Sequence, residues 1–374
     1  MAMYNELSNS FISISDPRDT NTKHKLVDIL TIATCAIICG ADTWTDIALY
    51  GKSKQEWFST FLELSHGIPS HDTFGRVFSI INPKEFQQAF INWIKDISSK
   101  VTGDVIAIDG KTVRHSFDTS NNKSAIHMVS AWANDLGLVL GQVKVDDKSN
   151  EITAIPELLD KIDVNKAIVT IDAMGTQKDI AKKIIKNGGD YVLALKGNQK
   201  NFFKDIEYFF EEESKNKFAD IEHSFFKTTN KDHGRIETRK HYLIKDLSWL
   251  SQKADWENLN SIIMVESERT IGDKTSKERR YYISSLTEDV EKVAISIRKH
   301  WGIENSLHWI LDVAFREDDS RVRIKNAAEN FAILRHIALN LLKNEKSIKV
   351  GVKAKRLKAG WDNDYLKKVL TSIQ

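Results

Sequence analysis

The sequence predicts an α/β protein in which an all-helical N-terminal unit precedes a mixed sheet. Three observations lead to this fold class. Apolar residues recur at helical spacing over residues 23–98, and short β-branched and aromatic segments bounded by turn residues begin at Asp104. Beyond residue 150, near-continuous apolar segments alternate with helical ones. That alternation is typical of parallel strands with helices on both faces of the sheet.

The composition is that of a folded, soluble protein. The chain has 374 residues, 41% hydrophobic and 28% charged, and its Lys+Arg count of 54 nearly matches its Asp+Glu count of 52. At about 150 residues per domain, this length predicts two or three domains. The net charge of +2 argues neither for nor against a nucleic-acid partner.

The cysteines and the N-terminus exclude several classes of protein. The chain has two cysteines, Cys35 and Cys39, too few for a disulfide scaffold. Because no second Cys pair or nearby His pair completes a zinc site, we expect both to be buried thiols. The longest apolar run, residues 29–40, is too short to span a bilayer. No basic segment followed by an apolar one begins the chain. We therefore expect a cytoplasmic protein without a membrane partner.

The helical unit occupies residues 1–100. Its apolar positions predict helices around residues 26–37, 44–48, 57–62 and 86–94, and Pro83 opens the last of these at its first turn. Residues 69–77, which include Arg76, are a candidate helix-turn-helix element, although no side chain can be assigned to a base edge. The unit is thus a candidate DNA-binding domain.

The second unit, residues 101–345, has the element order of the ribonuclease H-like fold. Three strands at residues 105–108, 125–133 and 137–145 form an antiparallel meander, and a helix, strand, helix and strand then follow at residues 152–162, 167–171, 176–187 and 191–195. The resulting order, β-β-β-α-β-α-β, gives the predicted fold class: an α/β protein with a ribonuclease H-like fold and an all-helical N-terminal domain.

A β-rich insertion at about residues 201–289 interrupts this unit. It starts with a helix through Phe210 and continues with four alternating segments between residues 223 and 286. Two long helices, at residues 290–313 and 326–344, complete the unit, and residues 346–374 form a basic C-terminal tail. Basic residues crowd the end of the chain from Arg321 and Arg323 to Lys358, which suits either a DNA backbone or a solvated helix face.

Three carboxylates are the candidate catalytic and metal-binding residues. Asp109 and Asp172 each follow an apolar strand, and reactive groups gather beyond the carboxyl ends of strands in open α/β sheets. Glu304 lies on an otherwise apolar helix face, where an unpaired carboxylate needs a cation. Three converging carboxylates suit two Mg²⁺ ions, with Mn²⁺ as a substitute, and two such ions promote displacement at phosphorus.

Each carboxylate also has a structural interpretation. Asp109 and Gly110 form a common turn dipeptide, and Asp172 could cap the helix that begins near residue 176. Glu304 could pair with Arg298 or Lys299. The combination of all three on this strand order favours a metal site.

Long segments resemble one family of insertion-sequence transposases, the H-repeat-associated family, which has a catalytic Asp-Asp-Glu triad. The segments that carry the resemblance are AIDGKTVRHS, TIDAMGTQKDIAKKIIKNGGDYVLALKGNQ, HGRIETR and HWGIENSLHWILDVAFREDDSRVR, and the N-terminal residues 16–51 and 68–78 resemble the accessory domain of that family. By position, the triad of the family falls on Asp109, Asp172 and Glu304.

This resemblance implies a DDE-type DNA transposase with a β-rich insertion in its catalytic fold. It would bind double-stranded DNA at the ends of an element, cut it, and join the freed 3′-hydroxyl to target DNA, as a homodimer in the nucleoid of a prokaryote. The chain departs from a better-known branch, which has Tyr, Arg and Lys around its catalytic Glu, because Ile297, His300 and Leu311 stand there. Arg298 or His300 could take the phosphate-positioning role.

Further residues are candidates for contacts with DNA or with the carboxylate of Glu304. Asn305 and His308 could hold Glu304, although His308 could equally be a core histidine. The candidate DNA contacts are Lys111, Lys196, Asn198, Arg235, Arg239, Arg298, His300, Arg321 and Arg323. Trp301 and Trp309 are expected in the core, whereas Trp249 and Trp256 could stack on a flipped base.

Two alternatives to a transposase remain open. A ribonuclease H-fold nuclease would cut DNA without joining it, and a non-catalytic DNA-binding protein derived from a transposase would do neither. The motifs of nucleotide hydrolases with a phosphate-binding loop, of zinc proteases and of serine hydrolases are absent from the sequence.

Overall fold

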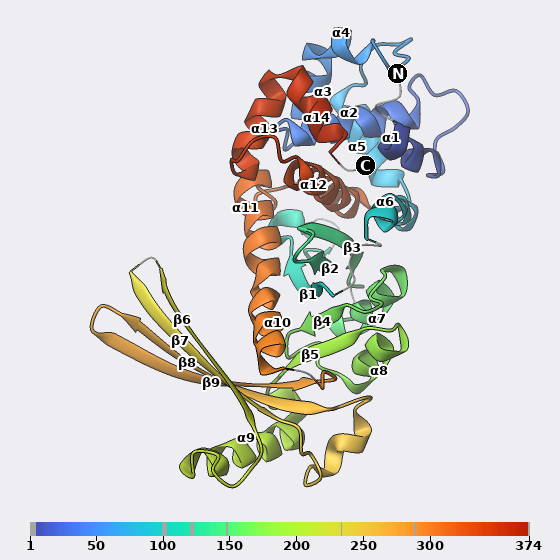
Figure 1. The fold of residues 1–374 in the computed structure, drawn as a ribbon. Helices are drawn as coiled ribbons and strands as arrows, with labels where there is room; N and C mark the ends of the chain where they lie inside the picture. The colour runs from blue at the N-terminus through green and yellow to red at the C-terminus, as the bar shows by residue number, and fades with distance from the viewer. Residues whose placement is uncertain are drawn as a thin grey trace.

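The computed structural model describes residues 5–98, 103–119, 123–146, 149–232, 234–287 and 289–372. One mixed sheet of nine strands runs through the molecule in the order β3-β2-β1-β4-β5-β9-β8-β7-β6. Figure 1 shows a helical end with both chain termini, a central sheet, and a long β-arm that projects to one side. A mixed α/β fold, as the sequence predicts, is thus confirmed.

The first five strands build the predicted central unit. They are β1 (Val105–Thr112), β2 (His127–Ala133), β3 (Leu138–Lys144), β4 (Ile168–Ile171) and β5 (Asp190–Leu195). The strands β1, β2 and β3 pair antiparallel, whereas β4 pairs parallel with both β1 and β5. Strand β4 and most of β5 are buried, which explains their nearly continuous apolar sequence.

Helices cover both faces of this sheet. On one face lie α7 (Glu151–Lys161) and α8 (Lys178–Lys186), which pack on β2, β3 and β5. On the other face, α10 (Val290–Ile303) crosses β1, β4 and β5 and continues through a π-helical turn at Glu304–His308 into α11 (Trp309–Phe315). This long helix carries one predicted catalytic residue over the strands that carry the other two (Figure 1).

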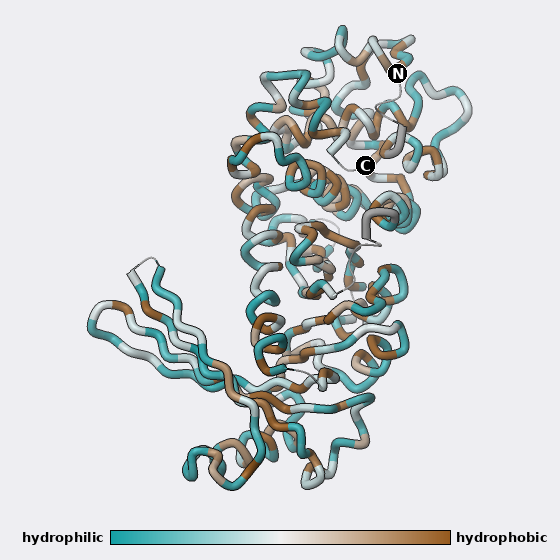
Figure 2. The backbone as a smooth tube through the Cα atoms, in the orientation of Figure 1, coloured by the Kyte–Doolittle hydropathy of each residue, from teal (hydrophilic) through white to brown (hydrophobic). Residues whose placement is uncertain are grey.

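The β-rich insertion extends the central sheet. It contains α9 (Lys200–Lys215) and the strands β6 (Ser224–Asp232), β7 (Arg235–Ile244), β8 (Ser261–Ile271) and β9 (Lys274–Ser284). The C-terminal half of β9 pairs antiparallel with β5, so the insertion joins the sheet at its edge. Figure 2 shows apolar residues where the arm meets the sheet and mostly hydrophilic ones toward its tip.

The N-terminal helices do not form an independent core. Residues 5–98 contain α1 (Asn5–Ile12), α2 (Leu26–Ile38), α3 (Trp44–Ser53), α4 (Gln55–Phe58), α5 (His71–Ile80) and α6 (Pro83–Ser98). The helices α2, α5 and α6 pack against α12 (Ala327–Asn344), and their apolar residues belong to the same buried cluster as those of the sheet. The segment is helical as predicted, but its independence as a domain is not confirmed.

The basic end of the chain is helical and partly buried. It forms α13 (Val352–Trp361) and α14 (Asn363–Leu370). Arg356 is 4% exposed and donates to the main-chain oxygen atoms of Ile37 and Ala314, which ties α13 to α2 and α11. Arg335 and Lys355 are also buried. The expectation of a phosphate-binding or solvated cluster is therefore wrong for these three residues, because they hold the helices together.

Candidate active site

Two of the predicted carboxylates occupy equivalent positions on neighbouring strands. Parallel pairing between β1 and β4 ends at Ile108 and Ile171, and Asp109 and Asp172 follow directly. Neighbouring strands lie about 4.8 Å apart, so the two residues start from adjacent backbone positions. The charge of Asp172 contributes to the raised pKa of Asp109, so the structure brings these two side chains near each other.

The alternative interpretations of both aspartates are wrong. Asp109 and Gly110 form no turn, because β1 continues through them and pairs with Ser130 and Val129 of β2. Asp172 does not cap α8, which begins at Lys178. Its Oδ1 instead accepts from the main-chain N–H groups of Met174 and Gly175, at 3.0 and 3.2 Å. This loop fixes one oxygen of Asp172 next to the sheet.

Glu304 reaches the same place from the long helix. It begins the π-helical turn between α10 and α11, in which the N–H of Trp309 donates to the main-chain oxygen of Glu304. Single π-helical turns inside α-helices occur frequently at functional sites. Here the turn carries Glu304 and His308 together toward Asp109.

His308 lies between the two carboxylates. Its Nδ1 is 3.6 Å from Oε2 of Glu304 and 3.8 Å from Oδ2 of Asp109. One possible ligand atom from each of these three residues lies within 4.8 Å of the other two. Among the described residues, His308 Nε2 has no hydrogen-bond partner. The predicted triad thus appears as a cluster of Asp109, Glu304 and His308, with Asp172 beside it.

The carboxylates of this cluster have strongly shifted pKa values. Burial, followed by the nearby Glu304 and Asp172 carboxylates, raises the pKa of Asp109 to about 8. The interaction with His308 lowers the pKa of Glu304 to about 2. Asp109 and Glu304 therefore share a proton near neutral pH rather than both ionising.

The helix face around Glu304 is more exposed than the sequence suggests. The side chain of Glu304 is 52% exposed, and Trp301 and Trp309, expected in the core, are 44% and 60% exposed. Helical periodicity identifies the face correctly, since His308 and Leu311 are buried on it. Part of the face, however, looks into the space between the sheet and the β-arm, which periodicity cannot show.

Gly302 allows the catalytic helix to approach the sheet. A Cβ at this position would lie 1.9 Å from Oδ1 and 3.1 Å from Cγ of Asn134, in the turn between β2 and β3. Asn134 is held there, because its Nδ2 donates to the main-chain oxygen of Val105 at 2.8 Å. Sequence reasoning missed this contact, since a glycine inside a helix gives no sign of what it faces.

Lys111 is a structural cation, which corrects its prediction as a DNA contact. Its side chain is 11% exposed, and its Nζ lies 2.7 Å from Asp312, 2.9 Å from Asp318 and 3.4 Å from Glu317. These three carboxylates follow Glu304 in the chain, so Lys111 ties the end of α11 to β1. Its charge is compensated within the protein and offers little to a phosphate.

His300 and Asn198 support the loop of Asp172. His300 Nδ1 lies 3.1 Å from the hydroxyl of Thr170 on β4. Burial lowers the pKa of His300, so it is neutral near pH 7 and does not replace an arginine as a phosphate-binding cation. Asn198 donates to the main-chain oxygen of Ala173 at 2.6 Å, next to Asp172. Both residues support the loop that carries Asp172, and their role as direct DNA contacts stays a prediction.

An arginine-lined groove lies between the β-arm and the helix that carries Glu304. The three predicted arginines Arg235, Arg239 and Arg298 line it together with Arg269 and Arg280, and Glu237 and Glu278 are its two acidic residues. Trp301 and Asn305 form its end next to Glu304. Its volume is about 390 Å³. We call it the arginine groove; the sequence prediction missed Arg269 and Arg280.

Strand register explains how these arginines come together. In the strand register, Glu237 lies opposite Arg269, and Arg239 lies opposite Ser267. Ser267 lies opposite Glu278 on the next strand. These residues therefore share one face of the arm. That face turns toward α10, which contacts β6 and β7. Arg280 lies over the Trp301 ring, 5.6 Å from its centre. Arg239 forms an ion pair with Glu237. By contrast, Arg235, Arg269 and Arg298 make no ion pair with any described residue.

Several other predicted contacts lie elsewhere. Lys196 is exposed and lines a cavity with Asp172 and His300. Trp256 is buried against Phe202, and Trp249 stacks on Phe209 with ring centres 4.2 Å apart, so the prediction that they stack on a flipped base is wrong. His233, quoted in the HGRIETR segment, lies outside the described residues.

The acidic cluster suits a divalent cation. Two carboxylate oxygens from Asp109 and Glu304 converge, and burial together with the neighbouring carboxylates raises the pKa of Asp109. Asp172 offers a third carboxylate on the adjacent strand. Oxygen donors of this kind are the preferred ligands of hard cations. The residues present therefore fit a metal centre in which Asp109 is central.

Two family models match most of the chain. The model described as DDE_Tnp_1-associated matches residues 8–94, and the model described as Transposase DDE domain matches residues 101–341. Among curated relatives, the "H repeat-associated putative transposase YhhI" of Escherichia coli K12 is 46% identical over 96% of this chain and 95% of its own length. The "Putative protein YbfL" of the same organism is 46% identical over 93% of both chains.

Solved structures give a weaker likeness. A cryo-EM structure of a piggyBac transposase synaptic complex with hairpin DNA matches with a TM-score of 0.42 and 10% sequence identity, covering 96% of this chain and 76% of that one. Separately, a search of the described helices finds none with the length and apolar character that a membrane crossing requires.

Proposed function

The chain belongs to the DDE transposase family, and from that premise we propose that it cuts and joins DNA as the transposase of an insertion sequence. The observation that carries the proposal is the meeting of Asp109, Glu304 and His308 beside Asp172, at the end of the arginine groove. Acidic residues suited to hard cations lie next to arginines suited to phosphate, as displacement at a phosphodiester requires.

We propose that Asp109, Asp172 and Glu304 hold two Mg²⁺ ions, for which Mn²⁺ can substitute. When bound, such ions activate the attacking oxygen and stabilise the leaving one. His308 and Asn305, on the same turn as Glu304, would orient its carboxylate.

The proposed reaction has two displacement steps. In the first, a water oxygen attacks phosphorus at the element end, the P–O3′ bond breaks, and the 3′-oxygen leaves with a proton. In the second, this 3′-hydroxyl attacks a phosphodiester of target DNA and displaces its 3′-oxygen. Arg235, Arg239 and Arg298 would hold the backbone of double-stranded DNA along the groove, with Lys196 on the Asp172 side.

The cellular setting follows from the same premise. Because two element ends must be joined in a coordinated way, we propose a homodimer in the DNA complex, measurable by light scattering with and without element-end duplex. We also propose that the protein acts on the nucleoid in the cytoplasm of its prokaryotic host. Fluorescence microscopy of a tagged full-length chain tests this location.

Conservative substitutions test the reaction. Asp109→Asn, Asp172→Asn and Glu304→Gln should each lower Mg²⁺-dependent nicking and joining of element-end DNA by at least about 10³-fold while retaining DNA binding. The matched control is Asp220→Asn, an exposed aspartate that follows α9, outside the cluster. Full cleavage by any of the three variants contradicts the site. Cleavage by the wild type without joining of pre-cut ends supports a nuclease instead.

A further inference from the structure

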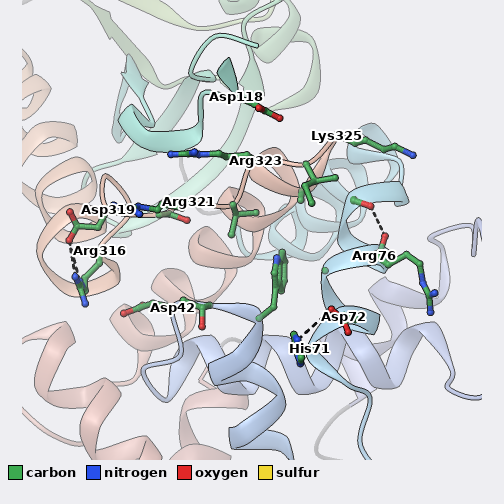
Figure 3. A pocket seen from close by; sticks show the side chains of 18 residues that line it. Asp42, His71, Asp72, Arg76, Asp118, Arg316, Asp319, Arg321, Arg323 and Lys325 are labelled. Carbon is green, nitrogen blue, oxygen red and sulfur yellow. Dashed lines mark hydrogen bonds and ion pairs between the residues drawn. The ribbon is translucent and has the colours of Figure 1, made fainter. Parts of the chain in front are cut away.

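A second basic groove lies between the N-terminal helices and the segment that joins α11 to α12. Residues of α5 form one wall and residues 316–325 form the other, around a cavity of about 850 Å³ (Figure 3). We call this the connector groove. Arg76, from the candidate helix-turn-helix element, and Arg321 and Arg323 from the connector all line it. Segments that are some 240 residues apart thus share one surface.

The charges in the connector groove do not cancel. Two of its four aspartates already pair with an arginine: Asp42 with Arg356 and Asp319 with Arg316. Asp72 lies 3.4 Å from His71, a contact that is an ion pair only when the histidine is protonated. The fourth, Asp118, lies toward one end of the view in Figure 3.

Three cations remain for a ligand. Arg76, Arg321 and Lys325 have no ion-pair partner in the part of the chain that the structure describes, and Arg321 and Lys325 are exposed. In Figure 3, Arg76 of α5 and Lys325 of the connector both extend toward the same side of the view. The groove therefore presents a positive surface that the protein itself does not neutralise.

The walls of the connector groove are fixed to each other and to the catalytic strand. Arg323 donates through Nε to the main-chain oxygen of His115 at 2.9 Å, and its guanidinium lies over the Phe117 ring. Asn326 donates to the main-chain oxygen of Ile81, just beyond α5, at 3.2 Å. A groove held in this way binds a ligand without a large ordering cost.

The exposed lining distinguishes between kinds of ligand. Small-molecule pockets bury most of the ligand surface. Here His71, Asp72, Arg316, Arg321, Ile324 and Lys325 are all exposed, so the groove is open along its length. An open groove with flexible arginine and lysine side chains suits a polyanion that continues beyond it in both directions.

The position of the groove relative to Glu304 sets a distance along that polyanion. Arg316, at the start of the connector, directly follows Phe315, the last residue of α11, and is 12 residues after Glu304. At 1.5 Å per residue the two positions are about 18 Å apart along the helix axis. For a duplex that runs parallel to this axis, 3.4 Å per nucleotide along one strand converts that distance to about five base pairs.

We propose that the connector groove binds the sugar-phosphate backbone of duplex DNA, beginning about five base pairs from the cleaved bond, on the side opposite the β-arm. This inference rests on the proposed function, because the cleaved bond is placed at the acidic cluster. It assigns to α5 and the connector a shared contact with phosphates, without readout of bases.

The test uses the full-length chain and a duplex from the element end, in buffer without divalent metal. The double variant Arg76→Ala with Arg321→Ala is compared with Lys182→Ala, which removes an exposed charge from α8 on the other face of the sheet. The slope of log K against log[salt] should fall by about 0.9 for each lost phosphate contact, hence by nearly 2 in the double variant, and stay unchanged in the control.

Backbone footprinting gives a second readout. Protection about five base pairs from the cut should disappear in the double variant, while protection at the cut remains. Thermal unfolding of each variant checks that the fold is retained. A wild-type chain that binds no duplex overturns the proposed function itself. A wild type that binds, with an unchanged salt slope and footprint in the double variant, overturns the connector groove alone.

Discussion

Gly302→Ala should reduce catalysis with little effect on folding. The added methyl group would lie 1.9 Å from Oδ1 of Asn134, whereas real Cβ contacts essentially never fall below 3.0 Å. Rotating the Asn134 amide only exchanges its oxygen for its nitrogen, and Cγ would still lie 3.1 Å away. Either Asn134 gives up its hydrogen bond to Val105 or the helix that carries Glu304 moves, and a displacement of that helix by on the order of 1 Å costs about 10²-fold in rate.

Stability should change far less, because two effects oppose each other. Alanine inside a helix is more favourable than glycine by about 0.5–1 kcal/mol. Overpacking costs about 1–3 kcal/mol. The free energy of unfolding should thus fall by only about 1 kcal/mol in Gly302→Ala. A change of that size leaves a native protein folded at 25 °C.

The double variant Gly302→Ala with Asn134→Ala separates the geometry from other causes. Truncation of Asn134 removes the atoms that the new methyl group meets, at the expense of one hydrogen bond to Val105, worth about 1 kcal/mol. Nicking of element-end DNA and Mn²⁺ affinity by calorimetry should recover toward those of Asn134→Ala alone. The reasoning fails if Gly302→Ala nicks within about twofold of the wild type, or if the double variant stays as slow as Gly302→Ala.

Three further predictions concern charge. In metal-free buffer and between about pH 4 and pH 8, Asp109 keeps a proton in the folded protein that it has released in the unfolded chain, because its pKa is raised in the folded state. The free energy of unfolding should therefore fall as the pH rises through this range, by at most about 1.4 kcal/mol per pH unit. Urea titrations should show this slope flattened in Asp109→Asn; an unchanged slope would contradict the shared proton. Lys111→Met should lower the free energy of unfolding by about 3–5 kcal/mol, because three acidic side chains lose their buried cation. Urea unfolding measures this loss, and the control Lys196→Ala, at an exposed position, should show almost none. Arg298→Ala should lower the salt slope of DNA binding by about 1 without changing the melting temperature, and an equal slope would exclude a phosphate contact.

The sequence predicts the central sheet well because its signals are local. Apolar strands bounded by turns, and helices with clear periodicity, place the five central strands close to where the structure has them. Asp109 and Asp172 could be found for the same reason, since each follows a recognisable apolar strand. In a parallel sheet, the positions just after paired strand ends necessarily lie side by side.

What could not be predicted depends on contacts between distant segments. Nothing in the sequence of β9 indicates that it pairs with β5, so the insertion was expected to interrupt the fold rather than to extend its sheet. Lys111 looked like a free cation because its three acidic partners lie some 200 residues later. Arg269 and Arg280 were missed because their shared face depends on strand register.

The long helix fixes the relation between the three charged regions. Arg298 of the arginine groove lies on α10, Glu304 of the acidic cluster begins the π-helical turn, and Arg316 of the connector groove directly follows the last residue of α11. At 1.5 Å per residue the two basic ends lie about 27 Å apart along the axis, with the acidic cluster between them. Because Lys111 anchors the end of α11 to β1, next to Asp109, the connector cannot move relative to the cluster without breaking these ion pairs. A duplex bound in both grooves would therefore be held in a single register, with one phosphodiester presented to the carboxylates.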